Sequence, residues 1–200
     1  MDNHSQLFAM IALYAVIAYW FVFATIFMIR KHKQDEKETK HDDASRIGIA
    51  LQGCAFGLTW LFRPRAQFLP QALTWPASVS IAMMVFIIAL ATASVWLVAT
   101  AVKTLGKQWA YVARLVEGHK LITDGPYRFV RNPIYTGMFG MLVATGLATE
   151  HWIQLAIAVV IFAIGTVVRV RSEEKLLQTA FGQEWDDYAK RVPAVIPGIY

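Results

Sequence analysis

The chain has 200 residues, enough for one domain or two small ones. Apolar residues make up 56% of it and charged residues 16%, against roughly 45–50% and about 25% in an average globular domain, which excludes a disordered chain. The single cysteine, Cys54, excludes an intramolecular disulfide scaffold, and a net charge of +5 favours basic loops beside anionic lipid headgroups over nucleic-acid binding.

The apolar residues lie in five blocks. Residues 7–29 and 78–102 contain no charged residue and no histidine, and each is long enough as a helix to cross a hydrocarbon core of about 30 Å. The other blocks, 47–62, 134–149 and 152–168, lie near the lower length limit for a span. The sequence therefore predicts an all-α integral membrane protein with about five transmembrane helices.

The last two blocks are separated only by Glu150 and His151. A single helix over residues 134–168 would be about 52 Å long, far longer than a bilayer is thick. We therefore predict a helical hairpin over residues 134–168 that turns at residues 149–151.

Basic residues alternate between the connecting segments. Of the 19 lysines and arginines, 17 lie in 30–46, in 103–133 or from residue 169 onward, and only two lie in 63–77. This is the positive-inside pattern, which predicts that the N-terminus faces outside and the C-terminal region faces the cytosol.

Two parts follow from these patterns. Residues 1–102 supply three N-terminal spans. Residues 103–200 form a core with the helical hairpin and a cytosolic C-terminal helix, and their polar, aromatic segments are where function is expected.

The segment before residue 134 predicts a turn and a helix start. Residues 124–126 read Asp-Gly-Pro, a turn signal, and Asn132 followed by Pro133 is typical of a helix cap with proline in the first helical position. The N-terminal amides of such a helix favour an anion, and Arg131 beside them could bind a carboxylate. An ordinary cap with an arginine at the lipid headgroups fits the same spacing.

Charged residues follow the fifth apolar block. If its helix continues, Arg169 and Glu173 are i, i+4 partners on one face, whereas Glu173 and Glu174 near the membrane edge would also suit a ligand ammonium group. Further on, Leu177, Phe181, Trp185 and Tyr188 have the spacing of one face of an amphipathic helix.

Metal binding is not indicated. His119 is a lone histidine in its segment, and no second histidine or cysteine stands at metal-ligand spacing. We therefore predict no metal site.

The motifs from residue 118 onward resemble the isoprenylcysteine carboxyl methyltransferase family, over about half of the chain. Where eukaryotic members typically read Arg-His-Pro, this chain has Asn132, which can cap a helix but cannot titrate. The ordered motifs are Gly118-His119-x-Leu121, Gly125-x-Tyr127, Arg131-Asn132-Pro133-x-Tyr135-x-Gly137, Glu173-Glu174-x-x-Leu177, Phe181-Gly182-x-x-Trp185-x-x-Tyr188 and Arg191-Val192-Pro193.

The resemblance implies an integral membrane enzyme that transfers a methyl group from S-adenosylmethionine to a lipophilic or prenylated acceptor from the bilayer. It implies a cytosolic cofactor site, and the compact chain suggests a prokaryotic inner membrane. The implied cofactor-binding residues are His119, Lys120, Leu121, Gly125, Tyr127, Arg131, Asn132, Pro133, Tyr135, Glu173 and Glu174.

Chemical roles follow from the resemblance and the charges of the cofactor. Arg131 suits the carboxylate of the cofactor, and Glu173 or Glu174 suits its ammonium group or a ribose hydroxyl. Tyr127 and Tyr135 suit its adenine or its sulfonium. The candidate catalytic residues are Arg169, Arg171 and Glu174. A carboxylate acceptor is already ionised and needs a cationic partner such as either arginine, whereas a thiol or amine needs a base.

Alternatives remain at this point. Within the superfamily, a phospholipid amine or a thiol could be the acceptor. A reductase of the sterol-reductase type would use NADPH, and a membrane scaffold or carrier would explain the helices without the ordered motifs. The oligomeric state is open.

Overall fold

The computed structural model describes residues 3–31, 43–61, 76–106, 120–149 and 151–196, and these ranges contain helices and no strand. The described residues of all five apolar blocks lie in helices, which confirms the prediction of an all-α protein. The helices are α1 (Asn3–Lys31), α2 (Asp43–Leu61), α3 (Ala77–Leu105), α4 (Pro133–Thr149), α5 (Trp152–Phe181) and α6 (Gln183–Ala189), with a 3-10 turn, η2 (Gly125–Arg128), before α4.

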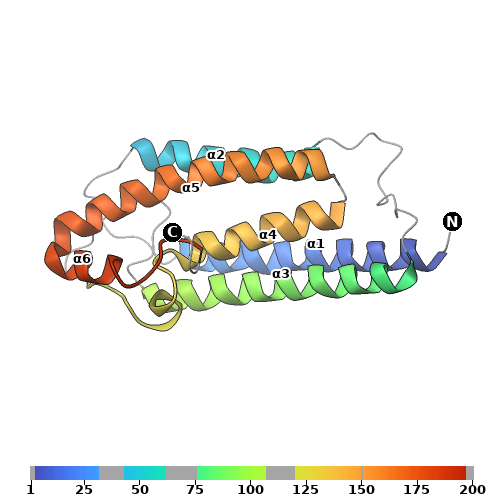
Figure 1. Ribbon diagram of the computed structural model, residues 1–200, viewed down its shortest axis with the longest axis horizontal. Helices are drawn as coiled ribbons and strands as arrows, with labels where there is room; N and C mark the ends of the chain where they lie inside the picture. The colour runs from blue at the N-terminus through green and yellow to red at the C-terminus, as the bar shows by residue number, and fades with distance from the viewer. Residues whose placement is uncertain (1–2, 32–42, 62–75, 107–119, 150, 197–200) are drawn as a thin grey trace.

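The five long helices run along the longest axis of the molecule (Figure 1). Helix α2 lies beside α5, α1 lies beside α3, and α4 lies between these two pairs and contacts all four helices. The turn η2, the start of α4 and helix α6 lie at the same end of the bundle, opposite the start of α1 (Figure 1). This end brings the two motif-bearing segments together.

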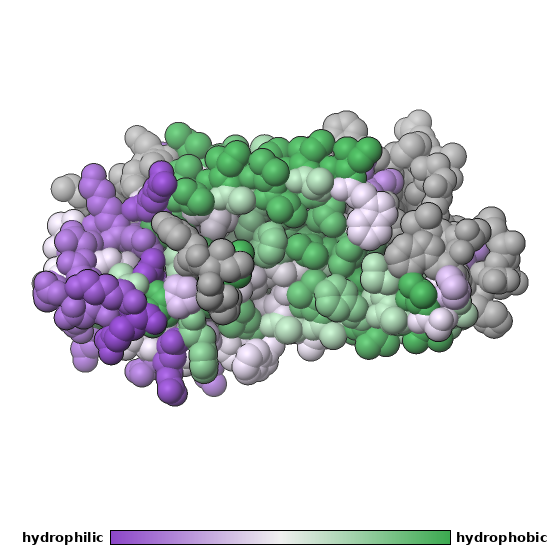
Figure 2. Space-filling view, in the orientation of Figure 1, coloured by the Kyte–Doolittle hydropathy of each residue, from purple (hydrophilic) through white to green (hydrophobic). Residues whose placement is uncertain are grey.

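Three helices of the described part are long and apolar enough to cross a membrane: Gln6–Ile29, Ala77–Leu105 and Trp152–Phe181. Figure 2 shows apolar side chains along the bundle, whereas hydrophilic side chains gather at the end that carries α6. Large apolar side chains such as Phe21, Trp96 and Ile153 are exposed on the outer faces of these helices. The chain is therefore an integral membrane protein.

The main apolar core joins α1, α3 and α4. Val16, Val98 and Met141 are fully buried there, one from each helix. A polar contact crosses the same interface, because Trp20 Nε1 donates to Thr145 Oγ1 over 3.0 Å. In an apolar environment such an indole N–H needs an acceptor, so this hydrogen bond helps to fix α1 against α4.

The predicted helix ends differ from the structure in the C-terminal region. The fifth helix continues beyond the apolar block to Phe181, as the i, i+4 spacing of Arg169 and Glu173 allowed, because the charged residues after 168 pair along the helix and across to α4. The prediction that Leu177, Phe181, Trp185 and Tyr188 share one helix is wrong: Gly182, with φ of 50°, ends α5 and lets the chain turn into α6. Trp185 and Tyr188 are buried on the shorter helix.

Helices α2 and α5 are in close contact at Gly48 and Gly165. A Cβ atom on Gly165 would lie 2.9 Å from the Gly48 carbonyl oxygen and 2.9 Å from Leu51 Cβ. Real Cβ atoms do not approach a backbone atom so closely, so only glycine fits. This small-residue contact sets the spacing of the two helices, as is common between membrane helices.

Candidate active site

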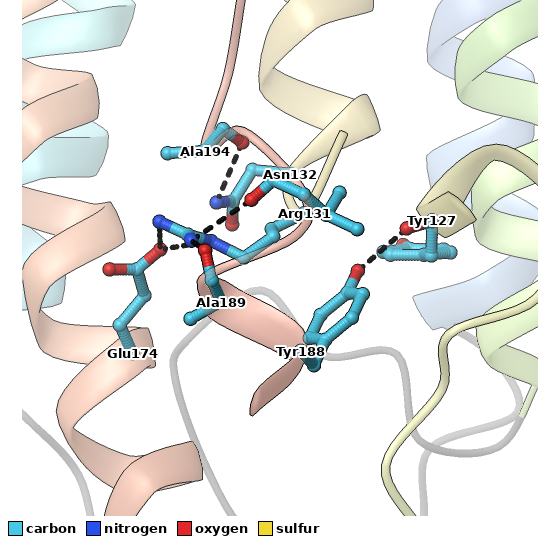
Figure 3. A network of polar contacts seen from close by, with 8 residues as sticks. Tyr127, Arg131, Asn132, Glu174, Tyr188, Ala189 and Ala194 are labelled. Carbon is cyan, nitrogen blue, oxygen red and sulfur yellow. Dashed lines mark hydrogen bonds and ion pairs between the residues drawn. The ribbon is translucent and has the colours of Figure 1, made fainter. Parts of the chain in front are cut away.

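The start of α4 is paired with the C-terminal segment that follows α6. The backbone N–H groups of Arg131 and Asn132 donate to the carbonyl oxygens of Pro193 and Ala194 over 2.8 and 2.9 Å. Asn132 Nδ2 also donates to the Ala194 carbonyl, over 3.1 Å (Figure 3). Residues 193–194 therefore lie against the residues that lead into α4.

This pairing changes the interpretation of Asn132. As predicted, α4 begins at Pro133, and the Asn132 carbonyl accepts the N–H groups of Tyr135 and Thr136 over 3.0 and 3.2 Å. The Asn132 side-chain amide, however, donates to the C-terminal segment. In the structure, its side chain thus holds two distant segments of the chain together.

Arg131 is the centre of a polar network at the same place (Figure 3). Its Nε donates to Glu174 Oε1 over 3.0 Å, and Nη2 of Arg131 lies 2.9 Å from the same oxygen. Its Nη1 donates to the carbonyl oxygens of Ala189 and Val192. One guanidinium therefore connects the residue before α4 with α5 and with the chain that leaves α6.

The aromatic residues of α6 complete this network. The Arg131 guanidinium lies 5.8 Å from the centre of the Trp185 ring, within cation–π range. Tyr188 OH donates to the Tyr127 carbonyl over 2.7 Å, which ties α6 to the turn η2 (Figure 3). Trp185 and Tyr188 also contact each other edge to face.

Burial raises the pKa of the Tyr188 and Tyr127 side chains. It raises the pKa of Tyr188 to about 12, with Glu174 adding to the rise and Arg131 opposing it. It also raises the pKa of Tyr127 well above its usual value, with smaller contributions from Glu173 and Tyr188. Both phenols are therefore neutral at physiological pH, and Tyr188 keeps the proton that it donates to the Tyr127 carbonyl.

We expect Tyr188→Phe to destabilise the fold by about 1–2 kcal/mol, because the variant leaves the buried Tyr127 carbonyl without this donor. The measurement is the midpoint of thermal unfolding in detergent. The matched control is Tyr14→Phe, at an exposed tyrosine on α1, which should leave the midpoint unchanged. Equal midpoints for Tyr188→Phe and the wild type would contradict the importance of this hydrogen bond.

The same phenol gives a pH dependence. A pKa of about 12 in the folded state, against an ordinary value of 10.0, means that the folded protein binds this proton more tightly than the unfolded chain. Its stabilisation is complete below about pH 10 and is lost as the pH rises towards 12. The difference in midpoint between wild type and Tyr188→Phe should therefore shrink over that interval.

A second polar cluster lies beside the first one. Tyr135 OH donates to Glu173 Oε1, and Arg169 Nη2 lies 3.4 Å from the same oxygen, as the i, i+4 spacing predicted. The Arg169 guanidinium also lies 4.9 Å from the centre of the Tyr135 ring. Glu173 thus has a phenol and a guanidinium as partners, and α4 and α5 are joined at this end of the bundle.

Arg169 itself is buried, with 8% of its surface exposed. Its Nη1 donates to Gln52 Oε1 on α2 over 3.2 Å, and Gln52 Nε2 in turn donates to Thr166 Oγ1 over 2.9 Å. A buried charge is costly unless it is paired and hydrogen-bonded, and these contacts supply partners for the terminal nitrogens Nη1 and Nη2 of Arg169.

The structure brings some of the predicted site residues together, and the others lie outside these contacts or outside the described residues. The contacts above join Tyr127, Arg131, Asn132, Tyr135, Arg169, Glu173 and Glu174. Pro133 is buried as the first residue of α4, and Leu121 is half-buried before η2, whereas Lys120, Gly125 and Arg171 are exposed. His119 lies outside the described residues.

Three contributions to the site were not predicted. Gln52 was overlooked, although it is a polar residue within the apolar block 47–62 and such residues in a span usually have a partner. Tyr188 was assigned to a packing face only. The motif Arg191-Val192-Pro193 marked this segment, but a role for the carbonyl groups of residues 189–194 was not predicted, because any residue supplies a carbonyl.

Comparison with known proteins gives the family. The family model described as phospholipid methyltransferase matches residues 78–184, more than half of the chain. Both polar clusters draw most of their side chains from this range. The chain therefore belongs to the phospholipid methyltransferase family.

Individual relatives agree with this assignment. Protein-S-isoprenylcysteine O-methyltransferase B of Arabidopsis thaliana is 34% identical over 101 residues, which cover 49% of this chain and 51% of the relative. The Mus musculus protein-S-isoprenylcysteine O-methyltransferase is 29% identical over 133 residues, 64% of this chain and 43% of the relative. These relatives confirm the resemblance predicted from the motifs.

A bacterial relative has a name that refers to metal resistance and not to methyl transfer. The nickel-cobalt-cadmium resistance protein NccN of Alcaligenes xylosoxydans xylosoxydans is 36% identical over 113 residues, 55% of this chain and 52% of the relative. The chain spans about half the length of the curated relatives it matches. Within the described residues, no group of three or more His, Cys, Asp or Glu side chains is placed to hold a metal ion.

Proposed function

We propose that this protein is a membrane methyltransferase that uses S-adenosylmethionine to methylate a lipophilic acceptor, with a prenylcysteine carboxylate as the first candidate. One observation carries the proposal. At one end of the bundle, the Arg131–Glu174 ion pair and the Tyr135–Glu173 hydrogen bond join motif residues that are distant in sequence. Both contacts lie within the range matched by the family model.

The proposed topology has five spans, with the N-terminus outside and the polar clusters on the cytosolic side of a prokaryotic inner membrane. Three helices meet the length and apolarity expected of a span, and the shorter α2 and α4 run alongside them (Figure 1). The distribution of lysine and arginine supports this orientation.

The side chains of the two polar clusters suit the charges of the proposed cofactor. S-adenosylmethionine carries an ammonium group, a carboxylate and a sulfonium, and when bound it supplies a methyl carbon made electrophilic by that sulfonium. Glu173 and Glu174 are partly exposed carboxylates that would attract its cationic groups, and the Tyr135 ring would suit the sulfonium.

Arg131 is proposed to act by holding the site together. Its guanidinium already binds Glu174 and two backbone carbonyls, so binding of a cofactor carboxylate would require an exchange of partners. The exposed Lys120 lies in the same loop segment and would supply a positive charge to that carboxylate.

Arg169 is proposed to bind the acceptor. A prenylcysteine carboxylate is ionised at neutral pH and needs no base, so the site has to orient it and shield it from water. Arg169 lies at the inner side of the cluster and offers a positive charge there, whereas Arg171 is exposed and would act only at the rim. With a thiol or amine acceptor, Glu174 is the proposed base.

The acceptor has two competing classes, a lipid amine and a thiol. The matched family is described as phospholipid methyltransferase, which favours keeping a lipid amine as the second candidate. The relatives named O-methyltransferases favour methyl transfer over the reductase and the carrier alternatives.

The test is calorimetric titration of the full chain in detergent with S-adenosylmethionine. We expect micromolar binding by the wild type and binding weakened about 10- to 100-fold by Glu173→Gln, because the variant removes a charge from a partly buried carboxylate. Glu184→Gln, at an exposed glutamate of α6, is the matched control and should bind as the wild type does.

Two outcomes would contradict the proposal. A well-folded wild type that does not bind S-adenosylmethionine would refute the cofactor assignment. Unchanged affinity in Glu173→Gln would place the cofactor elsewhere. With binding established, methyl transfer from labelled cofactor to N-acetyl-S-farnesylcysteine, to phosphatidylethanolamine and to an alkyl thiol identifies the class of acceptor.

A further inference from the structure

Helix α2 lies before the range of the family model, yet it contacts the polar cluster directly. Two of its residues, Gly48 and Gln52, are one helical turn apart and face Arg169 of α5. We call these two residues the Arg169 contact surface of α2. They contact different parts of the same arginine side chain.

Gly48 makes room for the aliphatic part of that side chain. A Cβ atom on residue 48 would overlap with Arg169 Cγ and would lie 3.2 Å from Arg169 Cδ. The α2 backbone therefore sets the path that the methylene groups of Arg169 follow away from α5.

Gln52 holds the other end. Its Oε1 accepts from Arg169 Nη1 over 3.2 Å, while its own Nε2 is anchored on Thr166 Oγ1 over 2.9 Å. Gln52 is 2% exposed, so water does not compete for these contacts. A doubly anchored amide in an apolar helix interface fixes the direction of the guanidinium that it binds.

The guanidinium fixed in this way is the one that lies over the Tyr135 ring and beside Glu173. We infer that the Arg169 contact surface of α2, formed by Gly48 and Gln52, sets the orientation of Arg169 in the active site. This inference rests on the proposed function, because the orientation of Arg169 matters only if the cluster binds a reacting molecule. It assigns α2 a part in the reaction in addition to its part in the fold.

The first arm of the test does not depend on catalysis. It compares the thermal midpoints of wild type, Gln52→Leu, Arg169→Leu and the double variant, all as full chains in detergent. We expect Gln52→Leu to lower the midpoint by about 3–6 °C in the wild type and by less than half of that shift when Arg169 is absent. Equal shifts in both backgrounds would overturn the inference.

The second arm measures methyl transfer at saturating S-adenosylmethionine, with the probe among the three above that the wild type accepts. We expect Gln52→Leu to lower the rate on the order of 100-fold while the affinity for the cofactor changes less than about threefold. Gln52→Glu keeps an acceptor for Arg169 and should recover most of the rate. A rate for Gln52→Leu equal to the wild type would overturn the positioning role.

Gly48→Ala gives a second route to the same answer if Gln52→Leu does not fold. It should displace Arg169 and lower the rate in the same way, since its Cβ overlaps with the arginine. The matched controls on the same helix are Gly53→Ala, where a Cβ meets nothing within 4 Å, and Thr59→Val, a buried polar residue bonded only within α2. Both controls should keep the wild-type rate.

The outcomes distinguish a failure of the proposed function from a failure of the positioning role of α2. A folded wild type that does not bind S-adenosylmethionine means that the proposed function has failed, whatever the variants do. A wild type that binds the cofactor and transfers the methyl group, with Gln52→Leu and Gly48→Ala both as active as the controls, means that the present inference alone has failed.

Discussion

Arg131→Ala should strongly weaken the binding of S-adenosylmethionine and destabilise the end of the bundle that carries the two polar clusters by about 3 kcal/mol. The variant leaves the partly buried Glu174 carboxylate without its cation. It also removes the hydrogen bonds that Arg131 donates to the carbonyl oxygens of Ala189 and Val192. Because these contacts hold the C-terminal segment against α4, we expect the affinity for S-adenosylmethionine to fall at least about 100-fold. Calorimetry and thermal unfolding of the same preparations check both effects.

The design of this experiment can separate charge from geometry. Arg131→Lys keeps the positive charge, but a single ammonium group cannot reproduce the planar fork that binds a carboxylate and two carbonyls at once, so we expect it to recover only a small part of the affinity. Arg191→Ala is the matched control, because Arg191 is an exposed arginine in the C-terminal segment that Arg131 contacts. Full recovery in Arg131→Lys would show that only the charge matters.

Gly165→Ala should destabilise the contact between α2 and α5 by about 1–3 kcal/mol. The added methyl group would lie 2.9 Å from the Gly48 carbonyl oxygen and from Leu51 Cβ, so α2 and α5 must separate. Because Gln52 reaches Arg169 across this interface, separation should also lower the rate of methyl transfer. The thermal midpoint and the rate are measured together.

The control for this substitution is again Gly53→Ala. Both variants replace a helical glycine by alanine, and both therefore gain the same intrinsic helix propensity. Gly53 has open space around it, whereas Gly165 is buried against α2. Equal midpoints for the two variants would show that the interface tolerates an added methyl group, contrary to the geometry.

The sequence predicted the helices well because each apolar block is long and nearly free of charge. It left the end of α5 open, because Arg169 and Glu173 fit both the polar residues that follow a span and an i, i+4 pair on a continued helix. In the structure these residues pair with each other and with α4, so the helix continues through them. Composition reports the polarity of a segment but not the partners that stabilise it.

The candidate site shows the same limit. The motifs indicated Arg131, Glu173 and Glu174 correctly as neighbours in one region, because local spacing and family resemblance both pointed there. They could not indicate that Arg131 binds Glu174 and the carbonyls of α6 and the following residues. Nor could they indicate that Gln52 reaches Arg169, since such contacts depend on how helices distant in the sequence are placed together.

The pairing of residues 131–132 with residues 193–194 has a consequence for how the molecule is made. The beginning of α4 finds its backbone and side-chain partners some sixty residues later in the chain. Contacts between such distant positions form late, because the intervening chain has to be ordered before they can close. While the protein is being synthesised, its helices can enter the bilayer, but the end that carries the two polar clusters cannot assemble until residues 193–194 have left the ribosome.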